Sequence, residues 1–200
     1  MTRLFEPLGM RDTDFWIPPN KRSRAAVVYT SPAPGQFTPV TIGSWLGSAP
    51  PAYTSGGQGL VSTADDYLTF ARMLVRRGQI GLRRVLKPET VRLMTSDRLK
   101  PSQKQAPAPA APDWRNSGFG LGVQVIANPV ANHMGFGRAG AFGWGGAFGG
   151  WWQGDPAEDM VLLWLQHCLP APPGPGAMPG HIPGVAGALA FQKAAYAALV

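Results

Sequence analysis

The sequence predicts an α+β fold in which helices pack against an antiparallel sheet. Three observations predict this class. Helical patterns occupy residues 61–100, strand-like stretches follow over 114–168, and another helical pattern closes the chain over 185–200. Strands that are grouped together, rather than alternating singly with helices, are typical of an antiparallel sheet with separate helices.

The composition is that of a globular chain with an excess of turn-forming residues. Of the 200 residues, 44% are hydrophobic and 14% are charged, while Gly and Pro number 26 and 21. Gly and Pro usually account for only about 12% of a chain, and here their share is nearly twice that. We therefore expect one domain over residues 1–200, partial in its fold and rich in turns and short strands.

Residues 1–60 predict the end of a short helix followed by a long loop. Pro7 and Gly9 are helix breakers, and from about residue 16 the prolines recur without any hydrophobic period. A loop of this length is usually functional or lies over another part of the fold.

Two helices are expected over 61–100. Residues 62–66 offer an N-cap hydroxyl followed by two acids, as helix starts prefer. One apolar helix face follows at the spacing i, i+3, i+4, i+7, formed by Tyr67, Phe70, Ala71 and Leu74. Residues 76–78 carry stop signals. A second helix begins at Pro88, a residue favoured at the first helical position, and runs towards Ser96.

Four strands are expected between a Pro/Ala-rich connector at 101–113 and a Pro/Gly-rich connector at 170–184. They are 118–127, roughly 137–142, 145–153 and 160–167. Residues 154–159, which read GDPAED, predict a hairpin connection between the last two. The chain then closes with an Ala-rich helix over 185–200.

The charge pattern favours no nucleic-acid partner. The net charge is +7, but the basic residues are scattered, and no nucleic-acid-binding motif accompanies them. A solvated basic surface is the better interpretation. No hydrophobic stretch approaches the roughly 20 residues of a membrane span, and residues 1–7 lack the apolar core of a secretory signal. For the sequence as written we expect a cytoplasmic protein, an expectation that an upstream segment would change.

No cofactor or metal is expected. The only cysteine, Cys168, excludes an internal disulfide and a C-x-x-C metal site, and it ends an apolar run, as a buried structural thiol would. His133, His167 and His181 lack metal-ligand spacing, which favours structural or solvated roles. A Ser-His-Asp triad stays open from sequence order, although no G-x-S-x-G elbow is present. Residues 135–140 match G-x-G-x-x-G, but no helix pattern follows, so we interpret them as a turn and strand.

Residues 143–152, which read GWGGAFGGWW, allow two interpretations. They predict either a strand that is weakened by its glycines and packs through its aromatic side chains, or a sheet edge against which a substrate lies. Glycine in a strand often marks the close approach of a ligand or another backbone. The stretch alone does not separate the two.

Four segments in order carry a family resemblance. They are residues 5–13 (FEPLGMRDT), 56–66 (GGQGLVSTADD), 118–122 (GFGLG) and 144–146 (WGG). The set resembles class C β-lactamase-like serine hydrolases of the penicillin-binding-protein/β-lactamase superfamily, in which W-G-G replaces K-T-G in the esterase branch. The resemblance implies the C-terminal half of a β-lactamase/transpeptidase-like fold.

The resemblance also implies a mechanism and a site. Enzymes of this family acylate a serine held in S-x-x-K, while a tyrosine of Y-x-N helps to move its proton. Two backbone N–H groups hold the oxyanion, and the one that follows W-G-G corresponds to Ala147. Trp144, Gly145 and Gly146 correspond to substrate-binding positions. An indole in place of the family lysine favours a small neutral acyl ester or amide over a β-lactam.

The nucleophile motif is absent from these 200 residues. No serine is followed by lysine three positions later, and no tyrosine by asparagine two positions later. Three explanations stay open. The chain is a fragment of a longer hydrolase, or one piece of a split enzyme completed by a separate N-terminal polypeptide, or a non-catalytic remnant that binds a partner or ligand.

Overall fold

Five antiparallel strands form the main sheet. The computed structural model describes residues 2–31, 35–41, 47–105, 116–129, 137–170 and 184–199. Within them the sheet has the order β5-β6-β7-β8-β9, and each neighbouring pair is antiparallel. The strands are β5 (Ser117–Phe119), β6 (Gln124–Ile126), β7 (Phe142–Gly145), β8 (Trp151–Asp155) and β9 (Met160–Trp164). The predicted α+β class, an antiparallel sheet with packed helices, is confirmed.

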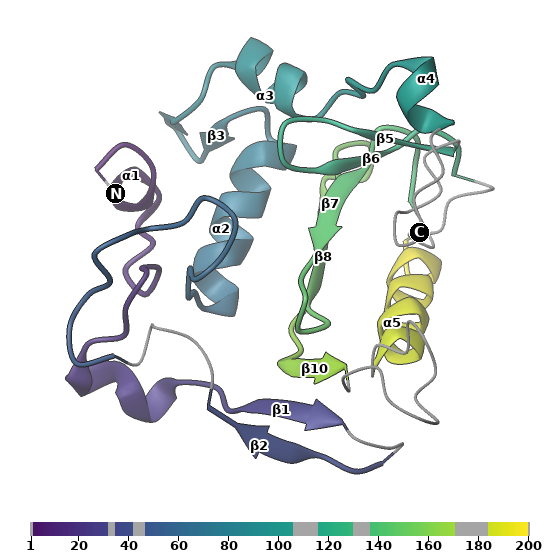
Figure 1. Cartoon of the computed structure of the whole chain (residues 1–200). Helices are drawn as coiled ribbons and strands as arrows, with labels where there is room; N and C mark the ends of the chain where they lie inside the picture. Colours follow the sequence, from purple (N-terminus) through teal and green to yellow (C-terminus); the bar gives the residue numbers. More distant parts are fainter. Residues whose placement is uncertain are drawn as a thin grey trace.

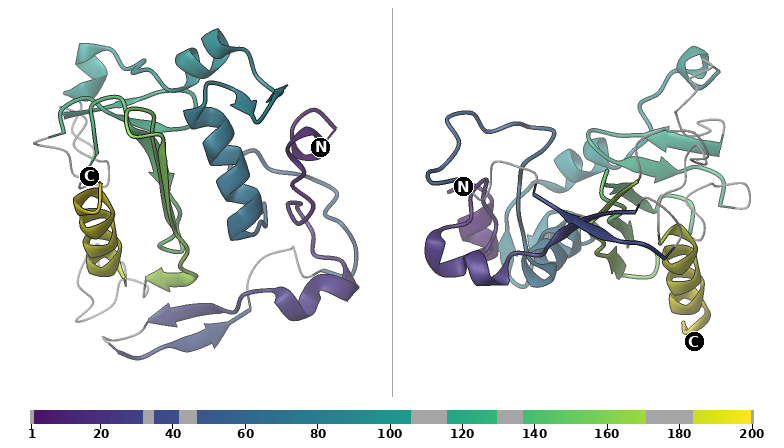
Figure 2. Two further views of the ribbon diagram at one scale, coloured as in Figure 1. Left: turned by 180° about the vertical axis from the view of Figure 1, so that it is seen from behind. Right: turned by 60° about the horizontal axis from the view of Figure 1, so that its bottom comes forward.

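Helices α2 (Ala64–Val75) and α5 (Val185–Ala197) lie on opposite faces of this sheet (Figures 1 and 2). Side chains alternate between the two faces of a strand, and β8 shows this directly. The Trp152 ring meets Tyr67 of α2 at a centroid distance of 5.7 Å. The next side chain, Gln153, accepts a hydrogen bond of 2.8 Å from Gln192 of α5.

The interface with α2 is apolar and holds the main core. The predicted helix is confirmed, and its N-cap is Thr63, whose hydroxyl accepts from the Asp66 N–H at 3.3 Å. The buried core side chains are Leu8, Met10, Ala71, Met73, Leu74, Val75, Val91, Val123, Val125, Phe142 and Trp152. Tyr67 and Phe70 of the predicted apolar face are partly buried against them, and burial raises the pKa of Tyr67 to about 12.

The contact between β8 and α5 is polar. The Tyr196 hydroxyl donates to the Asp155 carboxylate at 2.6 Å and accepts from the Gln153 side chain at 2.7 Å. Asp155 also accepts from the Arg138 N–H at 3.0 Å, and its residue is only 1% exposed. Burial, and then the hydrogen bond to Asp155, raise the pKa of Tyr196. Buried polar groups need such partners, so this network fixes how α5 sits on the sheet.

A second, smaller sheet joins the N-terminal region to the end of the meander. Its order is β10-β1-β2, formed by β1 (Val28–Ser31), β2 (Thr38–Val40) and β10 (Cys168–Pro170). β1 is parallel to β10 and antiparallel to β2. The long loop expected over 16–60 is therefore wrong for β1 and β2, and one partner of β1, the strand β10, lies far along the chain.

The remaining helices and strands are short. The N-terminal helix α1 (Phe5–Leu8) ends at Gly9, as its breakers predict, and the 3-10 helix η1 (Pro19–Arg24) follows. The predicted second helix is α3 (Pro88–Met94), with proline at its first turn. The others are β3 (Gln79–Ile80), β4 (Arg83–Arg84) and α4 (Pro101–Lys104).

Three predicted strands have wrong boundaries. The strand expected at 118–127 is a hairpin of β5 and β6, and its turn contains Gly122 with a φ of 93°. The strand expected at 145–153 is likewise divided by a turn that contains Gly149 with a φ of 84°. These left-handed conformations suit glycine and interrupt a strand. For the stretch expected at 137–142, the strand begins only at Phe142.

Other predictions concern residues outside the described part of the chain. These are the connector residues 106–115 and 171–183, His133, His181 and the first two residues of the G-x-G-x-x-G match. The last predicted strand, 160–167, is shorter and ends at Trp164, while the hairpin at 154–159 is confirmed.

The polar network predicts a cost for removing one hydroxyl. Tyr196→Phe leaves the buried Asp155 and Gln153 groups each without one partner, and we expect a loss of about 1–3 kcal/mol in the free energy of unfolding. The matched control is Tyr53→Phe at a tyrosine that is 79% exposed, where we expect no measurable change. Urea denaturation followed by circular dichroism measures both, and equal effects of the two variants would contradict the prediction.

Candidate active site

The segment Trp144 to Ala147 lies exposed at the end of β7. The four residues are all exposed, and the Trp144 residue is 39% accessible. β7 is held in place by β8, with Trp144 opposite Trp152 and Gly145 opposite Trp151. A Cβ on Gly143 would overlap the Trp152 carbonyl oxygen, so this close pairing requires glycine there.

Ala147 lies in the turn after β7 and not in a strand. The Gly149 N–H donates to the Gly146 carbonyl at 2.9 Å, and the Gly146 N–H donates to the Gly150 carbonyl at 2.7 Å. In such a four-residue turn the second residue has no partner inside the turn. Among the described residues, none accepts a hydrogen bond from the Ala147 N–H. The geometry leaves this N–H available as a donor.

An aromatic pair forms one wall beside this segment. Phe119 of β5 meets the Trp144 ring edge to face, at a centroid distance of 5.0 Å and an angle of 79°. Phe119 is itself held by the loop after α3, because its N–H donates to Asp97 at 3.3 Å and its carbonyl accepts from the Arg98 N–H at 2.9 Å. A Cβ on the neighbouring Gly120 would overlap the Met94 carbonyl. The G-x-G-L-G segment is therefore a packing motif.

The first two family-like segments meet in one hydrogen-bonded cluster. The Asp66 carboxylate accepts from the Asp12 N–H and from the Thr13 hydroxyl, both at 2.8 Å. Thr13 and Ser62 share a further hydrogen bond of 2.8 Å, and Asp14 and Val61 form a β-bridge. These residues attach residues 5–14 to the start of α2. Their spacing in the sequence carried the resemblance, but nothing in it indicated that they touch.

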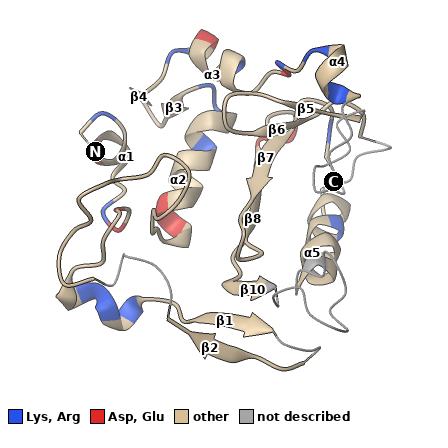
Figure 3. Ribbon diagram, viewed as in Figure 1, with Lys and Arg blue, Asp and Glu red and all other residues tan. Residues whose placement is uncertain are grey.

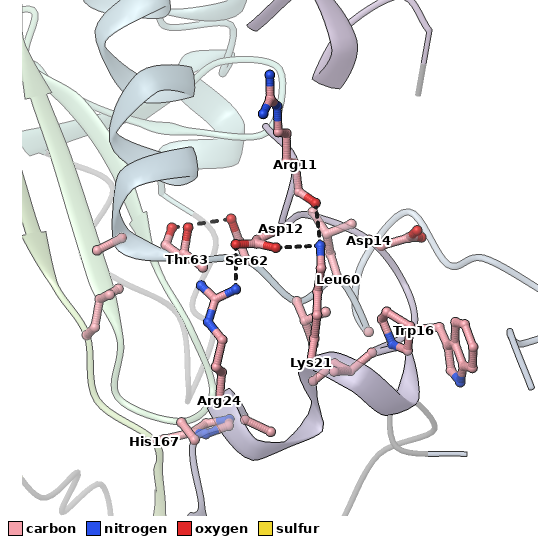
Figure 4. A pocket seen from close by; sticks show the side chains of 18 of the residues that line it. Arg11, Asp12, Asp14, Trp16, Lys21, Arg24, Leu60, Ser62, Thr63 and His167 are labelled. Atoms are coloured by element: carbon pink, nitrogen blue, oxygen red, sulfur yellow. Dashed lines mark hydrogen bonds and ion pairs between the residues drawn. The ribbon is translucent and has the colours of Figure 1, made fainter. Parts of the chain in front are cut away.

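A cavity of about 590 Å³ lies beside the start of α2 (Figure 4). Its lining comes from three parts of the chain, namely ten of the residues 11–26, residues 59–64, and Phe148 together with residues 165–167. Phe148 directly follows Ala147, so the cavity begins next to the candidate oxyanion donor. The predicted substrate-binding residues Trp144, Gly145 and Gly146 do not line it. No pattern in the sequence indicates this cavity.

The charges in the cavity wall are mostly paired. Lys21 and Arg24 reach from η1 to the Asp12 carboxylate, at 2.6 and 2.7 Å (Figure 4). These two hydrogen bonds lower the pKa of Asp12. His167 lies at the opposite wall, where its ring meets Phe148 at 4.9 Å, and burial lowers its pKa. His167 is thus mainly neutral near pH 7, and its predicted structural role stays a prediction.

Neither metal ligands nor a membrane span is found in the described part of the chain. Its His, Cys, Asp and Glu side chains form no group of three that could hold a metal ion. None of its helices has the length and apolarity needed to cross a bilayer. Lys and Arg are spread over η1 and several helices (Figure 3). Cys168 is buried, as predicted.

Comparison with protein families gives one match. The family described as Beta-lactamase matches residues 1–182. Two curated proteins of Mycobacterium tuberculosis, Protein Rv1367c of strain H37Rv and Uncharacterized protein MT1414 of strain CDC 1551, are each 43% identical over 169 residues. The match covers 83% of this chain and 42% of each relative, so the chain spans less than half of their length.

Solved structures share the fold. EstCE1, a hydrolase with promiscuous acyltransferase activity, is 26% identical with a TM-score of 0.66, over 84% of this chain and 44% of its own. A mutant of simvastatin synthase (LovD) from Aspergillus terreus is 23% identical with a TM-score of 0.70, over 98% and 48%. A class C beta lactamase from Rhodobacter sphaeroides is 16% identical with a TM-score of 0.54, over 88% and 49%.

The Asp66 cluster predicts a second stability effect. Asp66→Ala removes the acceptor of two hydrogen bonds, and we expect a loss of about 1.5–3 kcal/mol in the free energy of unfolding. Asp65→Ala is the matched control, because Asp65 is an exposed acid in the same helical turn. The control should lose at most about 0.3–1 kcal/mol from the helix dipole. A loss in Asp65→Ala as large as that in Asp66→Ala would contradict the role of the cluster.

His167 predicts a pH dependence of stability. Its pKa is lower in the folded chain than the ordinary value of 6.5, so below that pH the unfolded chain binds the proton more readily. We expect the free energy of unfolding to fall as the pH drops from 7.5 to 5.5, and His167→Gln to reduce this slope. The lowered pKa of Asp12 affects the free energy of unfolding only below about pH 4. An equal slope of the free energy of unfolding against pH in the parent and in His167→Gln would contradict this role of His167.

Proposed function

Because this chain belongs to the Beta-lactamase family, we propose that it forms the oxyanion side of a carboxylesterase-type serine hydrolase. The nucleophile comes from polypeptide outside these 200 residues, since the chain contains no S-x-x-K. This outside segment belongs to the same longer protein or to a separate N-terminal polypeptide. The single observation that carries the proposal is the exposed segment from Trp144 to Ala147, with the Ala147 N–H in a turn without an acceptor among the described residues.

The Ala147 N–H acts on the tetrahedral intermediate. When an acyl-serine forms or is hydrolysed, negative charge develops on the former carbonyl oxygen, and a fixed N–H donor stabilises it. The turn fixes this donor because Gly146, which precedes it, is hydrogen-bonded to both Gly149 and Gly150. The donor therefore needs no rearrangement when the charge appears.

Trp144 indicates a neutral substrate. Its indole offers an apolar surface and a single N–H donor, and Phe119 extends this surface at a centroid distance of 5.0 Å. No cation stands at this position to attract a substrate carboxylate. A small neutral acyl ester or amide suits this wall better than an anionic β-lactam. A cytoplasmic location and the lack of a nucleic-acid partner stay predictions from the sequence.

The test uses a completed enzyme. The part of Protein Rv1367c that lies outside its matched region is joined to the N-terminus of this chain, and hydrolysis of a p-nitrophenyl ester and of a β-lactam is measured. We expect hydrolysis of the ester by the fusion, slower hydrolysis of the β-lactam, and no hydrolysis by the 200-residue chain alone. A folded fusion that hydrolyses neither compound would overturn the proposal in favour of a non-catalytic binding protein.

Ala147→Pro tests the oxyanion donor itself. Proline removes the N–H yet is favoured at the second position of such a turn, so the fold should be retained. We expect kcat for the ester to fall by about 10²–10³-fold in the fusion. Ala147→Gly keeps the N–H and is the control, with kcat within a few-fold of the parent. A proline variant that keeps full activity would remove Ala147 from the mechanism.

A further inference from the structure

The excess positive charge of the chain comes from one continuous stretch. Residues 76–104 contain nine Lys and Arg and only two Asp and Glu, whereas the rest of the chain contains nine of each. The net charge of +7 is therefore the charge of this stretch alone. Its basic residues occur singly or in pairs, so they form no run of like charges along the sequence.

This stretch lies at one end of the molecule. Figures 1 and 2 show β3, α3 and α4 together with the β5–β6 hairpin beyond the C-terminal end of α2, at the top of both the front and the back view. The Leu121 N–H donates to the Met94 carbonyl at 2.9 Å, which joins the β5–β6 turn to the end of α3. We call this part the basic end and define it as residues 76–104 with the turn at 120–123.

Most charges of the basic end have no acidic partner. Two of its nine cations form ion pairs, Arg76 with Asp159 and Lys104 with Asp97. Among the described residues, none of the other seven cations forms an ion pair. All seven are exposed, namely Arg77, Arg83, Arg84, Lys87, Arg92, Arg98 and Lys100. The two of these that donate hydrogen bonds reach neutral acceptors, which are main-chain carbonyls and the Gln79 side chain. Such uncompensated charge attracts an anionic surface.

Three exposed leucines lie among these cations. Leu82, Leu93 and Leu121 are 103%, 43% and 59% exposed. Leu82 is the second residue of the two-residue turn between β3 and β4, and the first is Gly81 with a φ of 53°. Turns that begin with glycine usually have Asn, Asp or Ser in the second place. The basic end therefore presents an apolar side chain where a polar one is usual.

We propose that the basic end docks on the surface of an anionic lipid bilayer. Lys and Arg attract anionic headgroups, and exposed leucines enter the boundary between the headgroups and the acyl chains. A nucleic acid would use the cations through its phosphates, but it would leave the apolar tip of the β3–β4 hairpin without a role. The docked chain lies on the bilayer and does not cross it.

Vesicle co-sedimentation measures this docking with the full 200-residue chain. The basic end excludes Trp144 and Ala147, so the inference goes beyond the proposed function and needs no hydrolysis assay. One set of vesicles contains phosphatidylcholine alone, and the other contains two parts phosphatidylcholine and one part anionic phosphatidylglycerol. We expect the anionic vesicles to bind at least tenfold more tightly, and this difference to shrink in about 0.5 M NaCl because salt screens the attraction. The same measurement on the fusion protein covers the case in which the chain alone aggregates.

Two pairs of substitutions locate the charge. Arg92→Gln combined with Arg98→Gln removes two exposed cations from the basic end, and binding to the anionic vesicles should fall about tenfold or more. Arg11→Gln combined with Lys193→Gln removes two exposed cations outside it, and binding should stay within about threefold of the parent. In the described part of the chain none of these four side chains forms an ion pair, so both variants should fold, which circular dichroism checks.

Leu82→Asn tests the apolar contact. Asparagine suits the second position of this turn, so the hairpin should be retained. We expect binding to the anionic vesicles to fall about fivefold or more, because the leucine no longer enters the bilayer. Leu165→Asn makes the same change at a leucine that is 65% exposed and follows β9. This control should bind like the parent.

Several outcomes overturn the inference. They are equal binding to neutral and anionic vesicles, equal losses in the two pairs of charge variants, and unchanged binding by Leu82→Asn. Tighter binding to duplex DNA than to the anionic vesicles would also overturn it and would make the basic end a nucleic-acid surface. A folded protein that binds neither probe would leave the basic end as a solvated surface.

Discussion

The main sheet and the two helices on its faces, α2 and α5, depend on β8, whose alternate side chains serve two different interfaces. Trp152 faces α2, where contacts are apolar, and Gln153 and Asp155 face α5, where contacts are hydrogen bonds. Apolar contacts are non-directional, whereas a buried hydrogen bond fixes distance and angle. The core therefore supplies most of the cohesion, and the polar side sets one position for α5. The same strand holds β7, and through β7 the exposed segment that ends at Ala147.

The four segments that carried the family resemblance have different roles in the structure. Residues 5–13 and 56–66 are joined through Thr13, Ser62 and Asp66, and they position the start of α2. Residues 118–122 form a tight hairpin that is hydrogen-bonded to the end of α3 and the loop after it. The W-G-G segment continues into the turn that carries Ala147, whose N–H has no acceptor among the described residues. The first three segments thus hold parts of the scaffold together.

The sequence predicted the fold class and the helices α2 and α3 well, because their signals are local: a 3.6-residue apolar period, a capping hydroxyl and an N-terminal proline. The prediction of strands failed where a strand depends on a partner far along the chain, or where a glycine adopts a turn conformation. β1 pairs with β10, which lies far along the chain, as well as with β2. The glycine stretches predict continuous strands, but Gly122 and Gly149 adopt turn conformations. Ala147 and Trp144 came from the resemblance, whereas Phe119 and the cavity depend on tertiary contacts that no local pattern encodes.

The single thiol has a practical consequence. Cys168 is 5% exposed, and its N–H donates to the Phe148 carbonyl at 2.9 Å, directly behind the turn that carries Ala147. Burial covers the thiol and raises its pKa, so alkylating reagents reach a reactive thiolate only when the packing around β10 opens. The rate of alkylation at this one native cysteine thus reports how often that opening occurs. The chain carries its own reporter of local opening, with no label to introduce and no second cysteine to remove.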